Sequence, residues 1–145
     1  MSSAATPLPV PSDGKKLTAV QEDYLALIYT EALEHGAARG CSIAKSMGVT
    51  RGTVAVMLRA LKAAGFVQYE PYGPLHLTQE GRRAGAAVCE RRRILQDFFQ
   101  NVMKLEAATA ARLSHELEHA VNADSLRRFD RFNTFFAAHA DLLNF

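Results

Sequence analysis

Residues 42–65 carry the signals of two helices joined by a tight turn, and this pattern leaves few folds open to the chain. The segment Ser42–Gly48 fits a short helix that ends at a glycine, and Arg51–Ala64 fits a longer helix. Thr50 stands where a hydroxyl caps a helix, and Gly65 stands where glycine closes one. This order of a short helix, a tight turn and a longer helix predicts a helix-turn-helix.

The residues that follow predict a β-wing. Phe66–Glu70 reads as a short strand, Pro71–Pro74 as a turn and Leu75–Leu77 as the returning strand. Thr78 then caps a further helix. A helix-turn-helix with a wing is typical of proteins that bind duplex DNA, because the second helix fits the major groove. Some winged helices instead dock other proteins, which is the alternative at this point.

Residues of the second helix and its surroundings are the candidate DNA contacts. The first turn of a recognition helix meets base edges, whereas long cations around it reach phosphates. We expect Arg51 to reach guanine or phosphate, and Gly52 to let the backbone approach the duplex. The predicted DNA-binding residues are Lys45, Thr50, Arg51, Gly52, Thr53, Arg59, Lys62 and Tyr72.

Helical patterns flank this segment. Thr18 with Gln21 forms a capping box, and Gly36 ends the helix that follows. Its predicted apolar stripe is Val20, Tyr24, Leu27, Ile28 and Leu33. After the wing, helices are predicted near residues 79–103, 106–121 and 124–143. The fold class is therefore mainly α, with a winged helix-turn-helix at residues 17–80, an all-helical domain at residues 81–145, and a flexible tail at residues 1–16.

The last predicted helix carries more large apolar side chains than one small domain normally buries. Leu126, Phe129, Phe132, Phe135 and Phe136 all lie within it. We expect part of this surface to be the interface of a homodimer. A purely internal core is the alternative.

Charge and composition narrow the class of protein. The chain has 145 residues and a formal net charge of +2. Residues 40–93 contain nine basic and three acidic residues, a net charge of +6, so the rest carries −4. A basic middle suits a polyanion such as nucleic acid. Two cysteines, no apolar run long enough for a membrane and no signal-peptide pattern predict a cytoplasmic protein with no membrane partner.

The string His-Glu-Leu-Glu-His at residues 115–119 admits two interpretations. In a zinc peptidase, His115 and His119 would hold the metal and Glu116 would act as the general base. Alternatively, Glu118 joins both histidines as a ligand, because positions i, i+3 and i+4 share one helix face. A zinc peptidase needs a third ligand further along the chain, and only His139 follows. The context therefore favours a binding site over an enzyme.

A set of short stretches carries a resemblance to a known family: residues 17–29, 42–45, 52–58, 69–73, 77–81, 94–99 and 118–119. In this order they closely resemble the DtxR/MntR family of iron- and manganese-dependent repressors. They cover nearly the whole chain after the tail, and the length resembles the shorter form without an SH3-like domain.

The resemblance implies a metal site between the first helix and the dimerisation domain. The family's ligand positions fall on Asp23, His115, Glu118 and His119. Two imidazoles and two carboxylates suit one divalent ion per subunit, such as Mn, Fe, Co, Ni or Zn.

Two further ligand positions of the family fall on Ala26 and Arg92. Arginine stays protonated and binds no metal. Three outcomes remain open: a single ion with Arg92 outside its ligands or paired to Glu118 or Asp23, a metal-independent regulator in which Arg92 replaces the ion, or a substitute ligand such as Cys89.

The resemblance implies a homodimeric repressor of metal-homeostasis genes on a palindromic DNA operator, with metal as corepressor. Neither an enzymatic activity nor an organic small-molecule substrate is expected.

Overall fold

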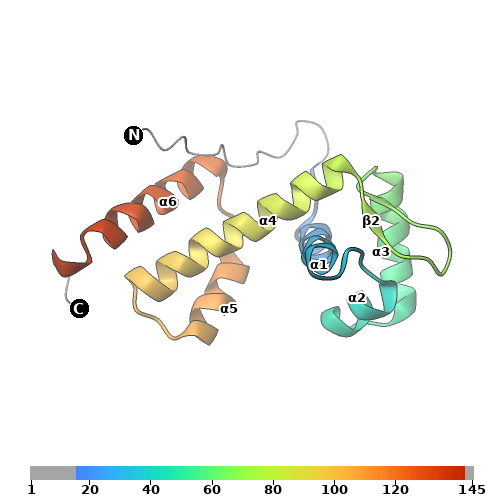
Figure 1. The fold of residues 1–145 in the computed structure, drawn as a ribbon, viewed down its shortest axis with the longest axis horizontal. Coiled ribbons are helices and arrows are strands. Elements are labelled where there is room, and N and C mark those ends of the chain that lie inside the picture. Colours follow the sequence, from blue (N-terminus) through green and yellow to red (C-terminus); the bar gives the residue numbers. More distant parts are fainter. Residues whose placement is uncertain (1–15, 143–145) are drawn as a thin grey trace. The chain divides into compact units, whose positions relative to one another are not determined.

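A computed structural model describes residues 16–142, so nearly all of the predicted tail lies outside the described residues. Six α-helices and a two-stranded wing account for most of this part, which confirms the predicted fold class (Figure 1). The elements are α1 (Ala19–His35), α2 (Gly40–Met47), α3 (Arg51–Ala63), β1 (Val67–Gln68), β2 (His76–Leu77), α4 (Gln79–Asp97), the π-helix η1 (Phe98–Val102), α5 (Ala107–Leu117), α6 (Ala123–Ala138) and the 3-10 helix η2 (Ala140–Leu142).

The chain divides into two compact units between Ala87 and Val88. The boundary falls inside α4, whose first part belongs to the first unit and whose last part belongs to the second. None of the helices within residues 16–142 has the length and apolar character that a membrane crossing requires.

Local signals set the ends of α1. The Thr18 hydroxyl accepts from the Gln21 amide at 3.2 Å, and the Gln21 side chain accepts from the Thr18 amide at 3.0 Å. Gly36 follows the helix with φ 82°, a left-handed conformation that glycine adopts without a steric cost. The predicted capping box and glycine stop are therefore confirmed.

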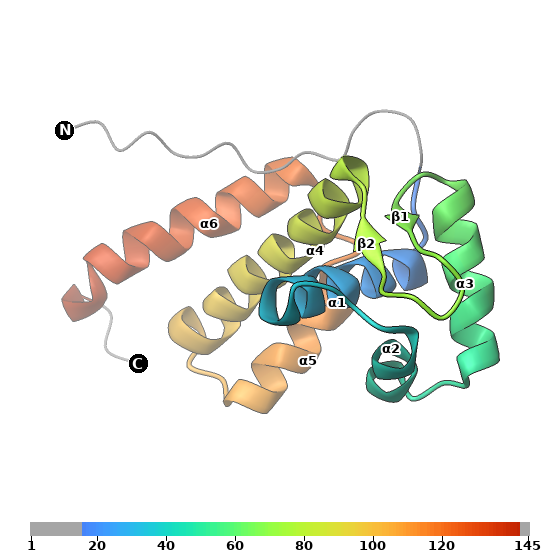
Figure 2. The same ribbon diagram turned by 45° about the vertical axis from the view of Figure 1, so that its right-hand side comes forward.

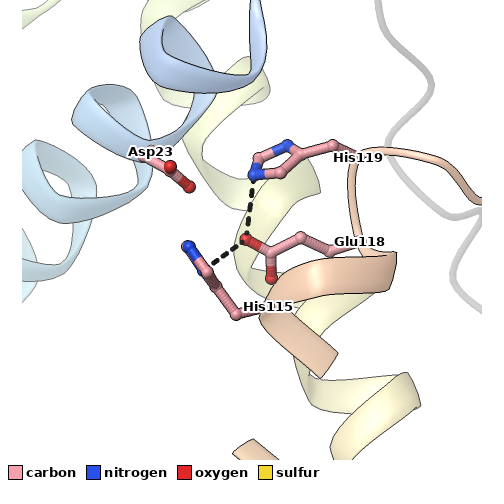
Figure 3. A group of neighbouring side chains, drawn as sticks. All are labelled: Asp23, His115, Glu118 and His119. Carbon is pink, nitrogen blue, oxygen red and sulfur yellow. Dashed lines mark ion pairs between the residues drawn. The ribbon is translucent and has the colours of Figure 1, made fainter. Parts of the chain in front are cut away.

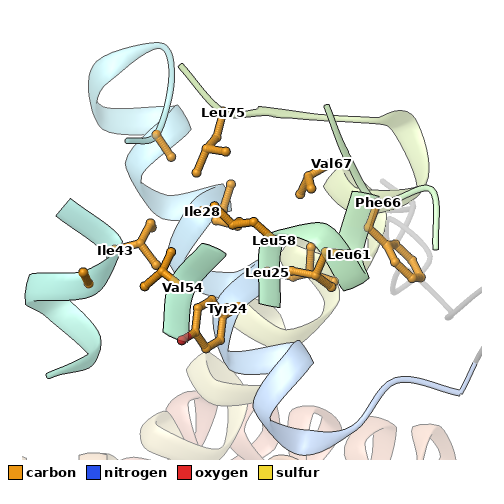
Figure 4. Packing of buried hydrophobic residues seen from close by; sticks show 12 residues of the cluster. Tyr24, Leu25, Ile28, Ile43, Val54, Leu58, Leu61, Phe66, Val67 and Leu75 are labelled. Carbon is orange, nitrogen blue, oxygen red and sulfur yellow. The ribbon is translucent and has the colours of Figure 1, made fainter. Parts of the chain in front are cut away.

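The core of the first unit lies where α1, α2, α3 and the wing meet (Figure 4). Its apolar side chains include Tyr24, Leu25, Ile28, Ile43, Val54, Leu58, Leu61, Phe66, Val67 and Leu75. The predicted apolar stripe of α1 is wrong at two residues, because Val20 is 51% exposed and Leu33 is 63% exposed. Leu25, which the pattern missed, is fully buried.

The helix-turn-helix and the wing follow the predicted order (Figure 2). β1 and β2 pair antiparallel, with Val67 opposite Leu77. Both strands are shorter than predicted. The segment between α1 and α2 adds to this pairing, since Ala38 and Leu75 exchange backbone hydrogen bonds of 3.3 and 2.8 Å.

A close approach fixes the first turns of α4 against the wing. The Thr78 hydroxyl caps the helix by accepting from the Gly81 amide at 3.0 Å. A Cβ atom at Gly81 would lie 1.9 Å from the Phe66 carbonyl oxygen. Only glycine fits there without a shift of the backbone.

In the second unit, α5 and α6 both pack against η1, the π-helix that follows α4. The Phe98 ring meets the rings of Phe129 and Phe132 edge to face, with centroids 4.9 and 6.2 Å apart. The Asn133 side chain donates to the Ile94 carbonyl oxygen at 3.0 Å and joins α6 to α4. The single helix predicted at residues 79–103 is therefore α4 followed by a π-helix.

The two last helices also differ from their predicted bounds. α5 ends at Leu117, before the predicted end at residue 121, and α6 begins at Ala123. Asn122 caps α6 by accepting from the Ser125 amide at 2.8 Å, so the chain must leave α5 before that residue. Glu118 thus stands at the C-cap of α5, and His119 lies in the turn that follows.

Candidate metal centre and nucleic-acid interface

A fully buried carboxylate is the centre of the candidate metal site. The Glu118 side chain is 0% exposed. It also lies at the C-terminal end of α5, where the helix dipole disfavours negative charge. A carboxylate in this position requires cationic or hydrogen-bonding partners.

Arg92 of α4 supplies the strongest of these partners. Its Nε donates to Glu118 Oε2 at 2.7 Å, and its Nη2 donates to Oε1 at 2.7 Å. This is the bidentate geometry that matches a guanidinium to a carboxylate. The Arg92 side chain remains 36% exposed, so one edge of the pair meets solvent.

Two imidazoles face the same carboxylate. His115 Nδ1 lies 3.3 Å from Glu118 Oε1, and His119 Nε2 lies 3.4 Å from that oxygen. The His115 side chain is 54% exposed, whereas that of His119 is 17% exposed. Each of the three residues offers a ligand atom within 4.8 Å of the others (Figure 3). The predicted i, i+3, i+4 spacing therefore brings these donors together even though the helix ends early.

The donor set fits a divalent first-row transition metal. Neutral imidazole nitrogens and a carboxylate oxygen are the ligands that such ions prefer, while calcium and magnesium prefer oxygen alone. The hydrogen bonds from Arg92 would also orient the carboxylate, as partners of metal ligands commonly do.

The remaining predicted or alternative ligands belong to α1 and α4. Asp23 is a half-buried residue of α1 in the first unit, whereas the other three ligands belong to the second. Ala26, on the same helix, is 1% exposed. Cys89 is partly buried and does not belong to the donor group found among residues 16–142.

Glu116, the base of the peptidase interpretation, does not belong to the donor group found among residues 16–142. It is exposed and accepts from Arg112 Nη1 at 3.0 Å across one turn of α5. Pairs of this kind are ordinary features of helix surfaces.

The first turn of α3 is exposed and forms the candidate recognition surface. The Thr50 hydroxyl accepts from the Thr53 amide at 3.2 Å, which confirms Thr50 as the N-cap. Arg51, Gly52 and Thr53 are exposed. A Cβ atom at Gly52 would meet only Thr50 Oγ1, at 3.8 Å, so nothing in the first unit crowds this face.

The other predicted DNA contacts differ in their exposure and in their contacts within the first unit. Lys45 and Arg59 are exposed side chains of α2 and α3. Lys62 Nζ donates to the Tyr69 carbonyl oxygen at 3.0 Å and lies 4.8 Å from the centre of the Tyr69 ring. Lys62 therefore also holds α3 to the wing. Tyr72, at the wing turn, has φ 61° and a fully exposed side chain.

A groove of about 780 Å³ runs between α3 and the wing. Its lining includes the cations Arg39, Arg51 and Arg59 and the rings of Tyr69 and Tyr72. Arg39, the N-cap residue of α2, is a candidate contact that the sequence patterns did not indicate. Val56 of α3 is an apolar side chain that is 59% exposed.

The fold and these two sites define a class: a winged-helix DNA-binding protein with a candidate metal centre in its second unit. The comparison with known families agrees. Residues 16–75 match the N-terminal DNA-binding domain of iron-dependent repressors, and residues 78–141 match the metal-binding and dimerisation domain of the same proteins. The chain belongs to the iron-dependent repressor family.

Individual relatives support this assignment. The chain is 34% identical over 111 residues to the transcriptional regulator MntR of Salmonella typhimurium, covering 77% of this chain and 70% of that protein. It is 29% identical over 119 residues to the HTH-type transcriptional regulator MntR of Shouchella clausii, covering 82% of each. A solved manganese-dependent transcriptional repressor in complex with manganese aligns with a TM-score of 0.71 at 31% identity, covering 79% of this chain and 53% of that structure. The chain thus spans about half the length of that solved chain.

Proposed function

We propose that this protein is a homodimeric transcriptional repressor that binds a palindromic operator when a divalent transition metal occupies its second unit. The observation that carries the proposal is the group of His115, Glu118 and His119 donors in the part that matches a metal-binding and dimerisation domain. The exposed first turn of α3 in the other unit supplies the DNA-binding half.

One ion per subunit is proposed, held by His115, Glu118 and His119 with Asp23 as the fourth ligand. The support for Asp23 is its position in the family pattern and its half-buried carboxylate on α1. The bound dication would attract the carboxylate oxygens of both Asp23 and Glu118. Mn, Fe, Co, Ni and Zn are all compatible with two nitrogens and two oxygens.

Each subunit is proposed to read one half-site. Arg51 and Thr53 would meet base edges, and Lys45, Arg59 and Tyr72 would contact the sugar-phosphate backbone. Two-fold symmetry would place the half-sites about one helical turn apart. Metal would raise operator affinity by favouring the arrangement of the two DNA-binding units that matches this spacing.

The proposed dimer contact lies on α6. Phe132 is 44% exposed and Phe135 is 54% exposed, on a helix whose buried face already holds Leu126 and Phe136. Exposed aromatic side chains of this kind mark protein–protein contacts.

The test is operator binding at controlled metal concentration. A duplex selected from a random library with the manganese-loaded protein serves as the probe, and affinity is measured by fluorescence anisotropy in EDTA and in each of the five metals. We expect at least one metal to strengthen binding, and His119→Ala to remove that gain while leaving the weak metal-free binding. Glu116→Gln is the matched control and should behave as wild type.

Two results would contradict parts of this proposal. Equal affinity in EDTA and in every metal would leave a metal-independent regulator in which Arg92 balances Glu118. Zinc-dependent peptide cleavage by the wild type, lost in Glu116→Gln, would restore the peptidase interpretation.

A further inference from the structure

One carboxylate oxygen in the candidate site, Glu118 Oε1, has three nitrogen neighbours but only about two lone pairs with which to accept hydrogen bonds. Glu118 Oε1 accepts from Arg92 Nη2 at 2.7 Å, and it also faces His115 Nδ1 at 3.3 Å and His119 Nε2 at 3.4 Å. The shortest of these contacts is the one to the guanidinium. Arg92 therefore makes the strongest interaction with this oxygen.

We infer that Arg92 is a built-in competitor for metal at Glu118 and that it sets the metal concentration at which the site fills. The inference rests on the proposed metal-dependent function. It assigns a specificity-determining role to a residue that binds no metal itself, because a guanidinium has five donors and no acceptor.

The charges decide the direction of the effect. The guanidinium of Arg92 already balances the negative charge of Glu118 through its two hydrogen bonds. A dication bound to the same carboxylate would lie beside this permanent positive charge, and the repulsion between the two cations would weaken its binding. Holding Glu118 in a productive orientation is a smaller benefit, since burial already restrains that side chain.

The exposure of Arg92 makes the competition reversible. Its side chain is 36% exposed, so the guanidinium can turn to solvent when an ion takes Oε1. Glu118 is 0% exposed and has no such freedom. The arginine is therefore the partner that moves, and its return to the carboxylate favours release of the ion.

Metal titration of the full chain tests this inference. Dissociation constants for Mn²⁺ and Co²⁺ are measured by isothermal titration calorimetry, and Co²⁺ binding is followed independently by its visible absorption. We expect Arg92→Gln to tighten binding by about tenfold or more, because it removes the competing charge. Arg92→Lys keeps the charge and loses the bidentate fork, so it should tighten binding less.

Arg93→Gln is the matched control. Arg93 is the next residue of α4 and also makes a bidentate pair, with Glu90 at 2.9 and 2.7 Å. Its loss should leave metal affinity unchanged. Circular dichroism in EDTA verifies that each variant is folded. If Arg92→Gln does not fold, the comparison of Arg92→Lys with the wild type still tests the inference.

The outcomes separate this inference from the proposed function. Metal binding by the wild type with equal or weaker binding by both Arg92 variants overturns the inference alone. Failure of the wild type and of both variants to bind either ion overturns the inference, and with it the metal-dependent function for Mn²⁺ and Co²⁺. Tighter binding by Arg92→Gln, with Arg93→Gln at the wild-type value, supports both.

Discussion

Removing the guanidinium from Arg92 should destabilise the metal-free protein. Glu118 loses two hydrogen bonds of 2.7 Å and keeps its full burial, so the variant Arg92→Gln holds a poorly compensated carboxylate. Breaking a buried ion pair from one side costs about 3–5 kcal/mol. Because Arg92 is 36% exposed and glutamine can still donate one hydrogen bond, we expect a loss of about 2 kcal/mol.

Urea unfolding in EDTA, followed by far-UV circular dichroism, measures this loss. The double variant Arg92→Gln with Glu118→Gln removes both charges and should lose less than the sum of the single variants, with a coupling of about 1–2 kcal/mol. Arg93→Gln breaks a surface pair and should lose less than about 1 kcal/mol. Stability equal to wild type in Arg92→Gln would show that Arg92 does not hold Glu118 in the metal-free protein.

The same variant should behave differently when metal is present. Each tenfold gain in metal affinity returns about 1.4 kcal/mol of stability at saturating metal, because the ion binds the folded state. The deficit of Arg92→Gln relative to wild type should therefore shrink in excess Mn²⁺. A deficit that is the same in EDTA and in metal would refute the competition between Arg92 and the ion.

Three further expectations concern other parts of the chain. Gly81→Ala places a Cβ atom 1.9 Å from the Phe66 carbonyl oxygen and should cost about 3 kcal/mol by thermal unfolding, so a wild-type melting temperature would contradict the described packing. The hydrogen bond from Arg93 lowers the pKa of the Glu90 carboxyl below its ordinary value of 4.5. The pairing of Glu90 with Arg93 therefore stabilises the protein at a pH above 4.5, and this stabilisation is lost as the pH falls through the lowered pKa of the folded protein. Glu90→Gln should therefore cost about 0.5 kcal/mol at neutral pH and nothing in strong acid, and an equal loss at both pH values would contradict this. Arg51→Ala should weaken operator binding, and if Arg51 contacts phosphate the slope of log affinity against log salt should fall by about 1, whereas unchanged affinity would remove Arg51 from the interface.

Local chemistry made the first unit largely predictable. Caps at Thr18, Thr50 and Thr78 act within three residues, and glycines that end helices act through their own backbone, so their effects can be read from short stretches of sequence. The helix-turn-helix and the wing follow from these signals in order. The apolar stripe of α1 was less reliable, because periodicity alone does not say where the core ends along a helix, and Val20 and Leu33 are exposed.

The donors of the candidate site in the second unit could also be identified from the sequence alone. The spacing of His115, Glu118 and His119 puts them on one side of a single turn, whatever follows that turn. Their electrostatics, in contrast, depend on the tertiary structure. It buries Glu118 completely, ends α5 at Leu117, and brings Arg92 of α4 to both carboxylate oxygens across 26 positions of the chain. The sequence left three outcomes open for Arg92, because the partner of a long, flexible cation depends on which helices pack together and not on neighbouring residues.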